Sequence, residues 1–81
     1  MQRDEILELM NRIQEKKSRS GINDDETTLS EVGFRSLDFS ELALRVEKSV
    51  GSELSFDAVA LREIQTVKDV LDFLEEAIRS E

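Results

Sequence analysis

The fold of this 81-residue chain is decided by the stretch SLDFSELALRVEKSVG, residues 36–51. Ser36 suits the N-cap position of a helix, Asp38 suits the positive end of the helix dipole, and Gly51 suits a left-handed C-terminal exit. We therefore expect a helix that begins at Ser36 and ends at about residue 50. Its apolar residues recur at spacings of three and four and predict one buried face: Phe39, Leu42, Ala43, Val46 and Val50.

A second stripe on the same predicted helix mixes apolar and charged residues. It consists of Leu37, Glu41, Leu44 and Lys48, again at spacings of four and three. Because this stripe lies away from the predicted buried face, Leu37 and Leu44 should either reach neighbouring loops or stay exposed for a partner.

The chain before this helix predicts one more helix and a long connection. Residues 4–17 place Ile6, Leu9, Met10 and Ile13 on one helical stripe. Gly21 is expected to take the left-handed turn that ends this helix. Between Gln14 and Thr28 only Ile22 is strongly apolar, which indicates a long solvated loop.

The remaining segments predict shorter elements and a last long helix. Residues 28–31 (TLSE) fit a capping box and favour a short helical turn before Gly33, and residues 57–63 favour a short helix. Thr66 caps a helix whose apolar face holds Val67, Val70, Leu71, Leu74 and Ile78. We expect an all-α fold: a small four-helix bundle of three main helices, one short helix and a long first loop, in a single domain over residues 1–81.

The composition excludes several kinds of active site. Lys and Arg number 11 against 19 Asp and Glu, a net charge of −8, and the chain has no Cys and no His. It therefore has no thiolate nucleophile, no imidazole base and no Cys or His ligands for zinc, and no calcium-loop motif is present. We expect neither an independent enzyme nor a metal site.

The charge balance and hydropathy indicate the partners. Nucleic acid needs clustered Lys and Arg, whereas an acidic excess suits basic protein surfaces. No apolar run reaches the roughly 20 residues of a membrane span, and the N-terminus is charged from its start. We therefore expect a cytoplasmic protein. Because the chain has no sustained heptad seam, we also expect a monomer.

The segment EVGFRSLDFSEL, residues 31–42, resembles the attachment segment of acyl carrier proteins, whose usual pattern is DLGxDSLDxxEL. Glu47 matches an acidic position late in that family's second helix, and residues 64–67 (IQTV) resemble the entry to its last helix. The resemblance thus covers essentially the whole chain. Six positions match the attachment pattern directly: Gly33, Ser36, Leu37, Asp38, Glu41 and Leu42.

This resemblance implies a carrier of thioesters. Ser36 would hold a 4′-phosphopantetheine arm, attached by a phosphopantetheinyl transferase that uses coenzyme A. Further partners would be an acyl-loading ligase or transferase, ketosynthase-type and other pathway enzymes with basic docking surfaces. A phosphodiester at a helix N-terminus also agrees with the dipole. The family's recognition positions correspond to Leu37, Asp38, Glu41, Leu44 and Glu47.

The departures from the pattern indicate a dedicated partner set. Arg35 replaces the aspartate that usually precedes the serine, Lys48 stands where an acidic residue is common, and Arg45 adds a further cation. We expect Arg35 and Lys48 to contribute to recognition in a specialised acyl, polyketide or aminoacyl pathway.

Two alternatives remain open for function and one for packing. The chain could be a peptidyl or aminoacyl carrier of nonribosomal assembly, or an unmodified acidic helical module that binds proteins. One set of residues could form either the core or the wall of a cavity for the acyl chain: Leu42, Val46, Val50, Leu61, Val67 and Leu71.

Overall fold

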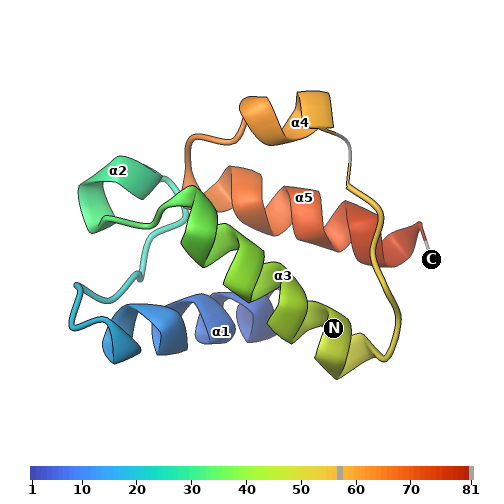
Figure 1. The fold of residues 1–81 in the computed structure, drawn as a ribbon. Helices are drawn as coiled ribbons and strands as arrows, with labels where there is room; N and C mark the ends of the chain where they lie inside the picture. Colours follow the sequence, from blue (N-terminus) through green and yellow to red (C-terminus); the bar gives the residue numbers. More distant parts are fainter. Residues whose placement is uncertain (57, 81) are drawn as a thin grey trace.

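A computed structural model describes residues 1–56 and 58–80, and all regular elements within them are helices (Figure 1). The only β-type pairing among these residues is an isolated antiparallel bridge between Thr28 and Thr66. The predicted all-α class is confirmed. Residue 57, where the predicted short helix begins, lies outside the described residues. The helices are α1 (Arg3–Lys16), α2 (Leu29–Val32), α3 (Ser36–Val50), α4 (Ala58–Arg62) and α5 (Val67–Arg79).

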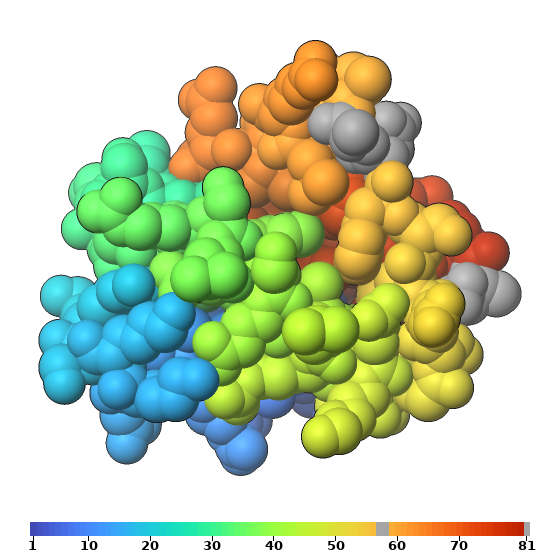
Figure 2. All heavy atoms as spheres, in the orientation of Figure 1, coloured from blue at the N-terminus to red at the C-terminus, as the bar shows by residue number. Residues whose placement is uncertain are grey.

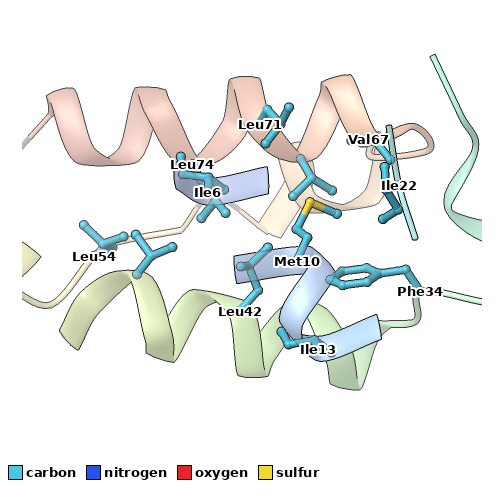
Figure 3. Packing of buried hydrophobic residues seen from close by; sticks show 12 residues of the cluster. Ile6, Met10, Ile13, Ile22, Phe34, Leu42, Leu54, Val67, Leu71 and Leu74 are labelled. Atoms are coloured by element: carbon cyan, nitrogen blue, oxygen red, sulfur yellow. The ribbon is translucent and has the colours of Figure 1, made fainter. Parts of the chain in front are cut away.

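The core lies where the three long helices meet. In Figure 1, α3 crosses in front of α1, α5 runs above these two helices, and α4 lies at the top of the view. Figure 3 shows Met10 of α1 pointing between α3 and α5. The buried cluster contains most of the predicted apolar faces of the three helices, while Leu9, Phe39, Val50 and Ile78 of those faces pack half-buried against it. The cluster also includes three residues from the connections, and its members are Ile6, Met10, Ile13, Ile22, Phe34, Leu42, Val46, Leu54, Val67, Val70, Leu71 and Leu74.

The end of α1 differs from the prediction. The helix ends at Lys16, and Ser18 takes the left-handed conformation at φ 57°. The N–H of Arg19 donates to the carbonyl of Gln14 (2.8 Å) and the N–H of Ser18 to that of Glu15 (3.0 Å), which is a Schellman motif. The expectation that Gly21 forms this turn is wrong, because these two bonds close the helix three residues earlier.

The long loop after α1 is held at several points. The side chain of Asn11 donates to the carbonyl of Ile22 (2.9 Å) and accepts from its N–H (2.6 Å), and Ile22 is buried. The backbone N–H of Val67 donates to the carbonyl of Thr27 (2.9 Å), and the backbone N–H of Lys68 donates to the carbonyl of Asp25 (2.7 Å). The loop is as long as predicted, but these bonds fix it between α1 and the start of α5.

Two of the predicted caps are present. The N–H of Glu31 donates to the Thr28 hydroxyl (3.3 Å), and the N–H of Asp69 donates to the Thr66 hydroxyl (3.2 Å). Both boxes close through the reciprocal carboxylate, as the sequence predicts. Within residues 1–56 and 58–80, no helix has the length and apolarity needed to cross a membrane.

Candidate functional site

The chain reaches Ser36 through a tight turn and a buried anchor. Gly33 ends α2 in the left-handed conformation, at φ 73°, and Phe34 is buried in the core. Arg35 then extends the backbone (φ −110°, ψ 176°), and Ser36 is the first residue of α3. This order brings Ser36 to the surface at the start of a 15-residue helix.

Ser36 is not the N-cap, so that prediction is wrong by one position. Arg35 holds the N-cap position, and its backbone N–H donates to the carboxylate of Asp38 at 2.8 Å. The Asp38 side chain therefore takes part in the cap, and the Ser36 hydroxyl is not needed for it. Among the described residues the Ser36 side chain has no hydrogen-bond partner, which leaves an exposed hydroxyl beside the free N–H groups of the first turn.

Asp38 lies inside the protein, with only 1% of its surface exposed. Its carboxylate accepts from the guanidinium of Arg19 at 2.6 Å and from the ammonium of Lys17. Burial opposes its ionisation, but the bonds from Lys17, the Arg35 N–H and Arg19 outweigh burial and lower the pKa of Asp38 to about 2. Asp38 was predicted to contact partners, and this burial leaves its carboxylate no exposed surface to offer them.

Gln14 is a buried polar residue that the sequence pattern does not mark as a site residue. It is 0% exposed, and its amide donates to the carbonyls of Ser20 (3.0 Å) and Val32 (2.8 Å). Arg19 donates to its amide oxygen at 3.3 Å. Gln14 thus joins α1, the following loop and α2, the three segments that precede Ser36. Its signal in the sequence is a polar residue four positions after Met10, on the apolar stripe of the first helix.

The exposed face of α3 has two large apolar side chains. Leu37 is 76% exposed and Leu44 is 66% exposed, so neither reaches a neighbouring loop. Lys48 is also exposed. Of the two expectations for this stripe, the structure shows the exposed one.

The two other predicted acidic positions on α3 are already engaged. Glu41 accepts from Lys16 at 2.5 Å and from Arg45 at 3.0 Å, and the hydrogen bond from Lys16 is the main cause that lowers the pKa of Glu41. Glu47 accepts from the backbone N–H of Leu54 at 2.7 Å, which fixes the chain after α3.

A pocket of about 750 Å³ opens beside Ser36. Leu61 lines it, whereas Leu42, Val46, Val67 and Leu71 are buried in the core, and Val50 packs half-buried against the core. Of the set that could form core or cavity wall, only Leu61 therefore reaches this pocket. Its lining residues come from both sides of the α2–α3 turn and from the end of α4: Thr28, Leu29, Ser30, Phe34, Arg35, Ser36, Phe39, Ser40, Leu61, Ile64 and Gln65.

Within the described part of the chain, no group of three or more carboxylates is arranged to hold a metal ion. The site therefore consists of the exposed Ser36 hydroxyl at a helix start and a neighbouring pocket of mixed polarity. A helix start of this kind can accommodate a negatively charged group attached to the hydroxyl.

Comparison with protein families identifies such a group. The phosphopantetheine attachment site family matches residues 5–74, and the chain belongs to this family. Its members bind 4′-phosphopantetheine covalently, so the chain is a phosphopantetheine-carrying protein. Neither the curated proteins nor the solved structures give a match.

Proposed function

We infer that Ser36 is the attachment residue for 4′-phosphopantetheine and that the protein carries acyl intermediates to partner enzymes. The observation that carries this proposal is the exposed, unpartnered Ser36 hydroxyl at the first residue of α3. In the transfer from coenzyme A, the serine oxygen forms the new bond to phosphorus and the bisphosphorylated adenosine leaves. The hydroxyl proton goes to a base of the transferase.

The residues around Ser36 fit a phosphodiester. The first-turn N–H groups of α3 have no acceptor within the helix, and the positive end of the helix dipole lies at the same place. Arg35 adds an exposed cation, while Asp38 is neutralised by Lys17 and Arg19 and does not repel the phosphate. When bound, the group supplies a terminal thiol on a flexible arm, which holds acyl groups as thioesters.

The pocket beside Ser36 supports a resting position for the arm. Its lining combines the hydroxyls of Thr28, Ser30 and Ser40 with apolar side chains from the end of α4 and the core. An arm that contains two amides and an alkyl stem needs both kinds of contact. The protein's own part is then to orient the arm and present it, while bound enzymes supply the catalytic groups.

We place the protein in fatty acid, polyketide or related specialised biosynthesis, as a cytoplasmic monomer formed by one domain. The cations Arg35 and Lys48, which depart from the acyl carrier pattern, favour a specialised pathway over a housekeeping one. Loading of the arm-bearing protein by acyl-activating rather than aminoacyl-activating ligases would support acyl cargo.

Intact-mass measurement tests the attachment site. The protein is incubated with coenzyme A and a broad-specificity phosphopantetheinyl transferase, and we expect a gain of one phosphopantetheine group. Ser36→Ala should gain nothing. Ser40→Ala is the matched control, because Ser40 is an exposed hydroxyl one turn further along α3 and also lines the pocket. A wild-type chain that gains no arm, or a Ser36→Ala chain that still gains one, overturns the proposal.

A further inference from the structure

The carboxylates of α3 are satisfied inside the molecule. Asp38 is shared by Lys17 and Arg19, and Glu41 is shared by Lys16 and Arg45. Each of these two carboxylates is thus paired with two cations. Of the four cations, three come from the end of α1 and the residues that follow it. The third carboxylate of α3, that of Glu47, accepts a hydrogen bond from the backbone N–H of Leu54. Asp38 has almost no exposed surface for a partner, and a partner that pairs with Glu41 competes with Lys16 and Arg45.

Two cations, one before the first residue of α3 and one in its last turn, remain unpaired among the described residues. Arg35, directly before Ser36, and Lys48, on the same stripe as Leu37 and Leu44, are exposed. Within residues 1–56 and 58–80, neither has an ion-pair partner. They stand at the two ends of the exposed leucine pair.

The charged residues from Arg35 to Lys48, taken with the cations that pair with them, have a net charge opposite to that of the whole chain. We define the α3 docking surface as Leu37, Leu44, the charged residues from Arg35 to Lys48, and the cations Lys16, Lys17 and Arg19. It holds six of the 11 Lys and Arg residues and three of the 19 Asp and Glu residues, a net charge of +3 in a chain of −8. In Figure 2 the side chains of α3 (green) cover the middle of one face and those of the end of α1 (blue) border them.

We propose that the α3 docking surface binds a partner protein whose contact region is an apolar recess surrounded by carboxylates. The recess covers Leu37 and Leu44, and the carboxylates pair with Arg35 and Lys48. This proposal rests on the proposed function, because it places the partner beside Ser36. It differs from the basic docking surfaces that the net charge and the family resemblance predict.

An acidic partner is favoured over a basic one because of where the cations lie within the chain. Encounter depends on the local field near the contact as well as on net charge, and salt screens distant charges beyond about 10 Å. Exposed leucines provide the apolar contact, and the free cations around them set which partner is accepted. A basic partner would approach Arg35 and Lys48 as like charges, whereas an acidic one would pair with both.

Two synthetic helical peptides test this surface. Both carry the same leucines, but the flanking positions are all Glu in one peptide and all Lys in the other. Binding to the full chain without the arm is followed by the backbone amide resonances of Leu37, Leu44 and Lys48. We expect the Glu peptide to shift these resonances, and the Lys peptide to shift resonances of the acidic remainder of the protein instead.

Charge reversal gives the second measurement. Arg35→Glu with Lys48→Glu should weaken the Glu peptide roughly tenfold, since two close charge pairs become repulsive. Arg62→Glu with Arg79→Glu is the matched control, because it changes the net charge equally at exposed residues outside the α3 docking surface, and it should leave this affinity within about twofold. The proposal is overturned if the Lys peptide shifts Leu37 and Leu44 more strongly, if neither peptide shifts them, or if the two double variants weaken binding equally.

The attachment assay on the same samples separates this proposal from the carrier function. A wild-type chain that takes up the arm but prefers the Lys peptide at Leu37 and Leu44 refutes only the acidic partner. A chain that binds the Glu peptide there but takes up no arm refutes the carrier function and leaves the α3 docking surface as a protein-binding face.

Discussion

The guanidinium of Arg19 lies 2.6 Å from the carboxylate of Asp38, and this pair joins the loop after α1 to the first turn of α3. Lys17 donates to the same carboxylate from the other side of the left-handed turn at Ser18. The position of Ser36 is therefore fixed by residues that precede it by 17 to 19 places as well as by its own helix.

Replacing Asp38 with Asn should destabilise the protein by about 3 kcal/mol, because Lys17 and Arg19 then lose the anion that compensates their partly buried charges. The free energy of unfolding from urea titration measures this loss. Glu8→Gln is the control: Glu8 pairs with Arg12 at 2.8 Å on the exposed face of α1, and its loss should cost less than about 1 kcal/mol. Equal losses for the two variants would contradict a structural role for Asp38.

Acid should weaken the protein through the same residue. The pKa of Asp38 is about 2 in the folded state, against about 3.9 in an unfolded chain, so its stabilising contribution is complete above pH 4 and is lost as the pH falls toward 2. Other carboxyls with lowered pKa values add to the slope in wild type and variant alike. The difference in unfolding free energy between wild type and Asp38→Asn should therefore shrink by about 2 kcal/mol between pH 5 and pH 2. A difference that stays constant over this range would show that Asp38 does not titrate as described.

Gln14→Leu should cost about 2 kcal/mol although it adds an apolar side chain to the core. The substitution removes the donor of two part-buried hydrogen bonds, those to the carbonyls of Ser20 and Val32. Thermal unfolding measures the loss, and Gln65→Leu, at an exposed position before α5, serves as the control. A Gln14→Leu protein as stable as wild type would mean that water replaces both bonds.

Much of the helical framework could be predicted because it depends on neighbours in sequence. The spacing of Leu42 and Val46 gives the buried face of α3, and the Thr28 and Thr66 boxes close over three residues, as capping boxes do. The left-handed conformation of Gly33 is local in the same way, since glycine adopts a positive φ without steric cost.

The roles of the charged residues could not be predicted from residue spacing. Asp38 is buried only because the chain after α1 returns with Lys17 and Arg19, a tertiary relationship that no spacing rule contains. The pairing of Glu41 with Lys16 has the same origin. On α3, whose acidic positions the family resemblance assigns to recognition, Asp38 and Glu41 are thus paired with cations, whereas the cations Arg35 and Lys48 have no ion-pair partner among the described residues. The predicted N-cap is wrong by one position, because the carboxylate of Asp38, and not the hydroxyl of Ser36, caps α3.

The left-handed turn at Gly33 should matter for attachment more than for stability, and Gly51 provides the comparison. Both glycines have a similar φ, 73° and 76°, so an alanine at either position should cost about 1 kcal/mol of unfolding free energy. A Cβ at Gly33 would lie 3.5 Å from the Arg19 side chain, an ordinary contact, and a Cβ at Gly51 would meet nothing within 4 Å. Both variants should therefore fold.

Only Gly33 lies in the turn that directs the chain toward Ser36. The rate of phosphopantetheine attachment under identical conditions should fall several-fold in Gly33→Ala and stay near the wild-type rate in Gly51→Ala, because attack by the hydroxyl depends on its orientation in the transferase complex. Circular dichroism of each sample establishes that the folded fraction is the same. Equal attachment rates in the two variants would mean that the start of α3, held by Asp38, orients Ser36 without the turn before it.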